Sequence, residues 1–191
     1  MHSVSRSLKL TINAIIVFIG IALVKKIVDL ALYTKGKSYR VFNVRFPDTT
    51  DPLVVFISTA IFVILFIALI YYLILLRSSV RDFIQAKIFT SVNGRRLKTA
   101  ARGFLVFVLL YFISSFVLEF YATDINSYPL DNSQRIFPRN KYAYHTGYVF
   151  GSTIAKNFAL GLLVIFALFL SLIAEVVKEG SLIKSENDLT I

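Results

Sequence analysis

Four long runs without a charged residue dominate the hydrophobic pattern of this chain, at Leu10–Val24, Pro52–Leu76, Gly103–Leu118 and Asn157–Ala174. A helix needs roughly 20 apolar residues to cross the ~30 Å hydrocarbon core of a bilayer. The second and fourth runs are long enough alone, whereas the other two need charged side chains at their ends to lie at the interface. The runs lack the alternation with a period of two that a transmembrane barrel requires. The pattern therefore predicts an all-α integral membrane protein with four transmembrane helices in a bundle.

The flanks of these runs define the expected boundaries and orientation. We expect one membrane domain over residues 1–191, with spans at about 8–30, 52–76, 102–122 and 152–178. The segment 77–102 contains seven Lys or Arg residues against one acid, so the positive-inside rule places it in the cytoplasm. Both termini are then cytoplasmic, and loops 31–51 and 123–151 are extracytoplasmic. The first run ends in Val24-Lys25-Lys26 and lacks a small-x-small cleavage site, so we expect it to be retained rather than removed as a signal peptide.

Composition excludes several classes of function. Hydrophobic residues make up 57% of the 191 residues and charged residues 17%, which is unlike a soluble globular enzyme. There is no cysteine and there are only two histidines, His2 and His145, which excludes disulfides, thiolate metal sites and a haem held by two histidines of one chain. Motifs such as phosphate loops, nucleophile elbows and zinc helices are unmatched. We therefore expect no enzyme activity, cofactor or metal, and we attribute the net charge of +10 to the cytoplasmic leaflet rather than to nucleic acid.

The outer loops contain a different pattern. Ser38–Phe46 alternates between two sets of side chains, and Lys141–Thr146 alternates more weakly. This alternation predicts a small extracytoplasmic strand pair over the outer ends of the helices. Tyrosines are frequent in these segments, as expected for rings at a membrane–water boundary. Together with Arg40, Arg45 and His145 they leave open a ligand-reading surface, beside the alternative of interfacial anchoring and local packing.

Small residues recur every four positions at the entrance to the fourth span: Gly147, Gly151, Ala155 and Ala159. The first two form a G-x-x-x-G pair, which lets helix backbones approach closely in a membrane. We interpret this set as a helix-packing ridge. Packing against another helix of the same chain is the favoured interpretation, and homodimerisation or docking of a partner helix is the alternative.

The segment between the second and third spans predicts two short helices. Val80–Phe89 spaces its apolar residues for an interfacial helix. Thr90 is a good N-cap for a helix from Ser91 that leads into the third span. Its four basic residues are expected to lie near anionic lipid headgroups, at about 1 kcal/mol each: Arg95, Arg96, Lys98 and Arg102.

Three segments on this side of the membrane resemble the signatures of a known family. The segment Phe89–Leu97 reads FTSVNGRRL, Ala174–Gly180 reads AEVVKEG, and the chain closes with SENDLTI at 185–191. They resemble the patterns F-[ST]-x-x-N-x-x-x-L, A-E-V-F-x-x-G and E-N-D-L-T-[IV] of the YoaS-like bacterial membrane proteins, domain of unknown function 2975. Val177 stands where that family usually has Phe. The resemblance implies four helices in the bacterial cytoplasmic (inner) membrane. Because members are often encoded beside a small repressor-like protein, it also implies a signalling or stress-response setting; it implies no catalytic residue.

The acidic end of the chain and the basic loop emerge on the same side of the predicted topology. We expect Glu186 and Asp188 to pair with Arg95, Arg96 or Arg102, while Leu189 and Ile191 pack against the loop helices; the alternative is a frayed, solvated terminus. The resulting candidate docking cluster contains Phe89, Asn93, Arg95, Arg96, Leu97, Arg102, Glu186, Asn187 and Asp188.

These features favour a non-enzymatic inner-membrane accessory or regulatory protein that acts through protein contacts at its cytoplasmic loop and acidic tail. Its expected partners are anionic headgroups at the basic loop and a membrane or cytoplasmic protein, with a homodimer as a further option. The alternative is a small transporter, channel or immunity-type protein that handles a peptide or small solute at its aromatic outer face.

Overall fold

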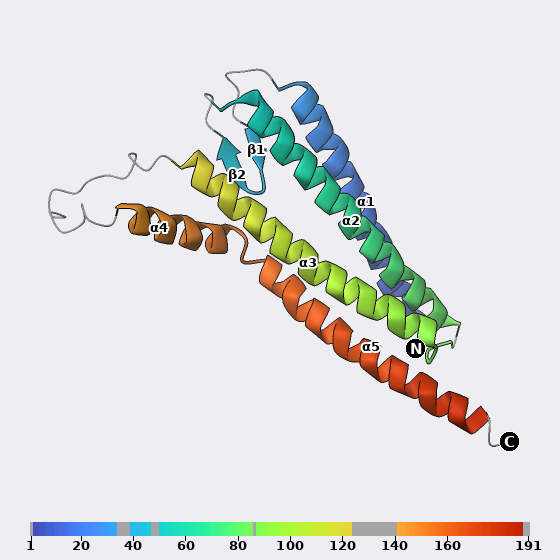
Figure 1. Ribbon diagram of the computed structural model, residues 1–191. Helices are drawn as coiled ribbons and strands as arrows, with labels where there is room; N and C mark the ends of the chain where they lie inside the picture. Colours follow the sequence, from blue (N-terminus) through green and yellow to red (C-terminus); the bar gives the residue numbers. More distant parts are fainter. Residues whose placement is uncertain (1, 34–38, 47–49, 86, 124–140, 189–191) are drawn as a thin grey trace.

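The computed structural model describes residues 2–33, 39–46, 50–85, 87–123 and 141–188 (Figure 1). In chain order these form α1 (His2–Ala31), β1 (Tyr39–Val41), β2 (Val44–Phe46), α2 (Pro52–Ile84), α3 (Ser91–Ala122), α4 (Lys141–Lys156) and α5 (Leu160–Asp188). Within the described residues, four helices are long and apolar enough to cross a membrane: α1, α2, α3 and α5. The predicted fold class is confirmed, and the chain is a multi-pass, all-α membrane protein.

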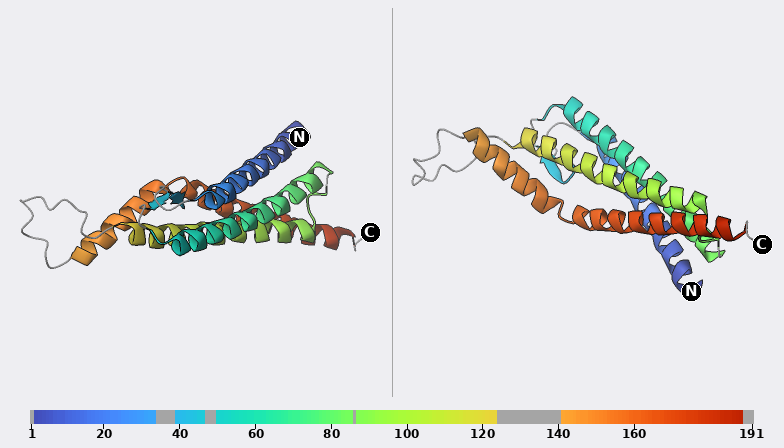
Figure 2. Two further views of the ribbon diagram at one scale, coloured as in Figure 1. Left: turned by 90° about the horizontal axis from the view of Figure 1, so that it is seen from above. Right: turned by 60° about the horizontal axis from the view of Figure 1, so that its bottom comes forward.

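The helices pack in a row rather than around a central axis. α1 packs on α2, α2 on α3 and α3 on α5, and α4 lies along the end of α3 (Figures 1 and 2). The described N-terminal end, the α2–α3 turn and the described C-terminal end lie at one end of the molecule, which we call the basic end (Figure 1). The strands and α4 lie toward the opposite end, which we call the hairpin end. α3 therefore contacts α2, α4, α5 and β2.

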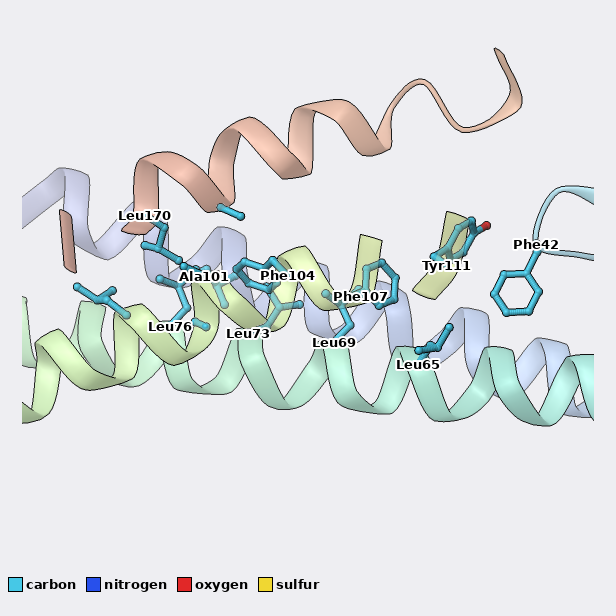
Figure 3. Close-up of a cluster of buried hydrophobic side chains, with 14 of the residues drawn as sticks. Phe42, Leu65, Leu69, Leu73, Leu76, Ala101, Phe104, Phe107, Tyr111 and Leu170 are labelled. Carbon is cyan, nitrogen blue, oxygen red and sulfur yellow. The ribbon is translucent and has the colours of Figure 1, made fainter. Parts of the chain in front are cut away.

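The core lies where α3 meets α2 and α5. Side chains three or four residues apart face inward, because that spacing places them on one side of a helix. The buried residues include Leu65, Leu69, Leu73 and Leu76 of α2, Ala101, Phe104, Phe107 and Tyr111 of α3, and Leu170 of α5 (Figure 3). Large apolar side chains on the outward faces are exposed. Such faces suit contact with lipid, where close packing rather than hydrophobic burial drives association between helices.

The strand pair is a hairpin within Tyr39–Phe46, and this corrects the predicted pairing. The strands are antiparallel, with Tyr39 opposite Phe46 and Arg40 opposite Arg45, whereas Lys141–Thr146 lies in α4. The chain reverses because Phe42 and Asn43 have φ values of 50° and 62°, which suit a two-residue turn of type I′. An alternating pattern of side chains does not indicate where the chain reverses direction.

The hairpin also lies deeper than predicted. Its Phe42 ring is 5.2 Å from the Phe62 ring and 4.9 Å from the Tyr111 ring, so the tip is inserted between α2 and α3 (Figure 3). Phe62 is ten residues into α2, about 15 Å along its axis. The hairpin therefore packs between the helices rather than over their ends.

Several helix boundaries differ from the sequence-based spans. The segment 77–102 is mostly helical, because α2 continues to Ile84 and α3 begins at Ser91. The predicted N-cap is confirmed: Thr90 Oγ1 accepts a hydrogen bond from Asn93 N at 3.2 Å. Near the fourth span, α4 ends at Lys156 and the apolar helix α5 begins only at Leu160.

Candidate interaction site at the basic end

The turn between α2 and α3 is held by the side chain of Asn93. Its Nδ2 donates to Lys87 O at 2.7 Å and to Ile88 O at 3.5 Å, and the residue is fully buried. A buried amide that donates to backbone carbonyls stabilises a turn, because carbonyls outside regular helices and strands need such hydrogen-bond partners. The entry to α3 is therefore tied to the segment before it.

α5 packs closely at two glycines near this turn, against α3 at Gly94 and against Phe89, which precedes α3, at Gly180. A Cβ atom added at Gly94 would lie 3.4 Å from Ala174 O and from Lys178 Cα, which is an ordinary contact distance. At Gly180 an added Cβ would overlap the ring of Phe89. The ring of Phe89 therefore covers Gly180, and small residues allow the backbones to come together as in other membrane helix pairs.

Two ion pairs flank the buried Leu97 on α3. Lys98 Nζ donates to Glu175 Oε1 of α5, and Arg96 Nη1 lies 2.8 Å from Asp82 Oδ2 of α2. Both pairs are partly exposed, so each contributes little to stability on its own. Their effect is to set the rotation of α3, because opposite sides of one helical turn bind two different neighbours.

A second polar cluster joins α4 to α3 at the hairpin end. Glu119 of α3 is buried, and its Oε1 accepts hydrogen bonds from Ser152 Oγ at 3.1 Å and from Lys156 Nζ. A buried carboxylate needs such donors, because its desolvation is otherwise costly. This ion pair fixes α4 to the end of α3.

Asn157 links the hairpin to α3 at the point where α4 ends. Its Nδ2 donates to Ser115 Oγ at 2.9 Å and to Thr153 O at 2.9 Å, while its Oδ1 accepts from Asn43 Nδ2 at 3.2 Å. Ser115 Oγ in turn donates to Phe42 O at 3.0 Å. The network satisfies the backbone of the inserted turn, which lipid cannot do.

The hairpin is also tied to α1 and α2. Lys26 Nζ donates to Arg40 O and lies 4.7 Å from the centre of the Tyr39 ring, a cation–π distance. Thr59 Oγ1 donates to Tyr39 Oη at 3.2 Å. Burial raises the pKa of Tyr39, so its hydroxyl stays protonated. The described residues contain no cluster of metal-binding side chains here or elsewhere.

Comparison with known proteins identifies the family. A family model described as "Protein of unknown function (DUF2975)" matches residues 31–191. The chain belongs to this family. No curated protein and no solved structure matches it. The match confirms the family that the motifs of Phe89–Leu97 and Ala174–Gly180 indicated, and it covers every element except nearly all of α1.

In this DUF2975 chain the two motif segments form one junction. The first segment contributes three residues at the start of α3. Asn93 hydrogen-bonds to the preceding turn, Leu97 is buried, and Phe89 covers Gly180 of the second segment. The ion pair beside this junction joins Lys98, which directly follows the first segment, to Glu175 of the second, a pairing that sequence reasoning missed. Gly94 and Lys98 are four residues apart, so they lie on the same face of α3. Because Gly94 contacts α5, this spacing is the signal that would have placed Lys98 beside α5.

The remaining residues of the docking cluster have different positions. Arg96, one of three expected partners of the acidic tail, pairs with Asp82, while Arg95 and Arg102 are exposed. Glu186 and Asn187 are exposed near the end of α5. Asp188 is the last residue of that helix; its side chain, with Leu189 and Ile191, lies outside the described residues.

α5 continues as a helix beyond its contact with Phe89. We call residues 181–188 the α5 extension. This segment projects past the other helices (Figures 1 and 2). Leu182 and Ile183 in it are 55% and 59% exposed. The acidic residues near the end of α5 are therefore carried on a helix.

The candidate residues at the hairpin end do not form one surface. Arg40 and Arg45 are exposed, whereas His145 is buried, with its ring 4.6 Å from that of Phe120. The helix-packing ridge (Gly147, Gly151, Ala155 and Ala159) is exposed along α4 and into the turn that follows. A Cβ added at either glycine of the ridge would meet nothing within 4 Å in the described part of the chain. Packing within one chain, the favoured interpretation, is not what the described structure shows.

Proposed function

We propose that this protein is a non-enzymatic accessory or regulatory protein of the bacterial cytoplasmic membrane that acts through protein contacts at its basic end. The positive-inside rule supports a cytoplasmic position for this end, because seven Lys or Arg residues lie within 77–102. Both termini then face the cytoplasm. Arg95 and Arg102 are exposed, which supports contact of these side chains with anionic headgroups.

The single observation that carries the proposal is the α5 extension. We take the ion pair between Lys98 and Glu175 as the level along α5 at which the apolar run ends and charged side chains begin. Leu182 lies seven residues further on, about 10 Å along the helix axis. Both Leu182 and Ile183 then project from the membrane into water, where burying a side chain of this size in a partner gains about 1.5–3 kcal/mol.

The chemistry of the α5 extension indicates the kind of partner. Its two adjacent apolar residues lie among Lys184, Glu186 and hydroxyl-bearing serines. A short helix with an apolar patch and mixed charge suits an apolar groove with a polar rim on a cytoplasmic protein. The close packing at Phe89 and Gly180 holds the helix in position, so little ordering entropy opposes binding.

The proposal is tested by truncating the patch and a matched patch elsewhere. The variant L182A/I183A removes apolar atoms from the α5 extension. The control V17A/V24A removes them from two side chains of α1 that are 59% and 63% exposed. We expect the first variant to lower recovery of a stoichiometric protein partner in mild detergent at least tenfold, and the control to leave it unchanged.

Site-specific photo-cross-linking gives an independent measurement in intact cells. A photoreactive residue at Leu182 should give an adduct with one protein of discrete mass, and the same residue at Val17 should give lipid adducts only. Equal partner recovery with both alanine variants, or lipid adducts alone from Leu182, would contradict the proposal. Unchanged melting temperatures for both variants show that folding is not responsible for the difference.

A further inference from the structure

A small basic pocket lies between α1 and α2 at the basic end, away from the α3–α5 junction. Its volume is about 140 Å³, and it is lined by Lys9 of α1 and by Ile74, Arg77, Ser78 and Arg81 of α2. Three of the five lining residues are cationic and none is acidic. The pocket has no part in the proposed protein contacts of the α5 extension.

Among the described residues, neither Lys9 nor Arg77 forms an ion pair, and the one that Arg81 forms is long. Arg77 and Arg81 are four residues apart on one helix, so their like charges repel. The carboxylate of Asp82 is directed to Arg96 at 2.8 Å and is 3.9 Å from Arg81 Nε, at the limit of an ion pair. An anion between α1 and α2 would relieve this repulsion and bind with charge-assisted hydrogen bonds.

The level of the pocket in the membrane identifies the source of that anion. Lys9 is the last charged residue before the apolar run of α1, and Arg77 is the first after the apolar run of α2. Both therefore lie at the boundary between hydrocarbon and headgroups, where phospholipid phosphates are found. Basic pockets between transmembrane helices on the cytoplasmic side bind the headgroups of anionic lipids.

We propose that this pocket binds the phosphate of an anionic phospholipid, which bridges α1 to α2. The guanidinium groups of Arg77 and Arg81 hold the phosphate oxygens, and the Lys9 ammonium contacts the same group from α1. Among the described elements, the main helix contact of α1 is with α2. A bridging lipid therefore strengthens the attachment of a helix that precedes nearly all of the family match.

The experiment measures lipid binding by the full chain in detergent with native mass spectrometry. The probes are phosphatidylglycerol and phosphatidylcholine with identical acyl chains. We expect the first phosphatidylglycerol to bind at least tenfold more tightly than phosphatidylcholine. The variant R77Q/R81Q should abolish this preference, whereas K87Q/K184Q, which removes equal charge from two exposed side chains at the same end, should change it less than twofold. Equal loss in both variants would overturn the site, because it would indicate a general charge effect.

Two further arms distinguish the source of the anion and the role of α1. Inorganic phosphate that displaces phosphatidylglycerol at millimolar concentration would assign the pocket to a free anion and overturn the lipid proposal. The variant K9Q leaves α2 unchanged and should weaken phosphatidylglycerol binding several-fold; an unchanged affinity would overturn the bridge. K9Q also provides a variant that tests the site if R77Q/R81Q fails to fold.

Discussion

The contact between α2 and α3 makes a sharp prediction at Gly103. A Cβ atom added there would overlap three ring atoms of Tyr72. That ring is confined, because its centre lies 5.4 Å from the Tyr71 ring and 6.4 Å from the Phe104 ring. G103A therefore either displaces Tyr72 or separates the two helices.

The magnitude follows from a matched glycine elsewhere. Forcing one extra carbon into a packed contact costs about 1–3 kcal/mol. Ala is intrinsically better than Gly in a helix by about 1 kcal/mol. Gly20 of α1 has no atom within 4 Å of an added Cβ, so G20A receives only the propensity gain. The difference between G103A and G20A therefore isolates the packing cost, about 1–3 kcal/mol, whereas G103A alone is expected to lose about 0–2 kcal/mol.

Unfolding in mixed micelles with sodium dodecyl sulfate measures this difference. The chain has no cysteine, so two introduced cysteines on α2 and α3 can carry dyes for energy transfer. We expect G103A to unfold at a lower detergent fraction than G20A. Y72A should cost less in the G103A background than in the wild type, because there the loss of the ring also relieves its overlap with the added Cβ. Identical midpoints and a coupling energy of zero would refute the packing of α2 against α3 through this contact.

Three further predictions concern the hairpin end and use the same assay. K156M should destabilise the protein by about 2–3 kcal/mol, and E119Q by less than ~1 kcal/mol. The Glu119 side chain is 8% exposed and the Lys156 side chain is 40% exposed, so only K156M leaves a buried charge without its partner. Equal losses of stability would contradict this asymmetry. N157L should cost about 1–2 kcal/mol, the sum of membrane hydrogen bonds of about 0.6 kcal/mol each, and an unchanged midpoint would show that the network contributes nothing. F42A should cost about 3–5 kcal/mol, and F42G should be no less stable than F42A, contrary to the usual order, because φ at this position is 50°; a clear advantage for Ala would refute the left-handed turn.

The local parts of the fold follow from the sequence because their causes are local. The apolar runs predict the membrane helices through length and hydropathy alone. Thr90 marks the start of α3, since a side-chain oxygen three residues before Asn93 N can cap it in any context. The motif segments around Phe89 and Gly180 indicate the family before any contact between them is known.

The sequence predicted the strands of the hairpin but not its turn. Alternation in Tyr39–Phe46 indicates strand, but a type I′ turn is normally signalled by Asn-Gly, and here the turn residues are Phe42 and Asn43. The left-handed conformation of Phe42 is unfavourable in isolation. It is stabilised by burial of the ring against Phe62 and Tyr111, which belong to helices far away in the sequence.

The sequence by itself determined that the chain crosses a membrane, where most helices lie and which family it belongs to. Hydropathy, capping and the family motifs each depend on a few neighbouring residues. Only the tertiary structure decided which charges pair. Lys98 meets Glu175 across 77 positions, and Asp82 takes Arg96. Such choices depend on how each helix is rotated and on how far a neighbouring helix continues. That geometry results from close packing at Gly94, Gly103 and Gly180. The packing energy is the sum of many weak van der Waals contacts, which a local sequence pattern does not predict.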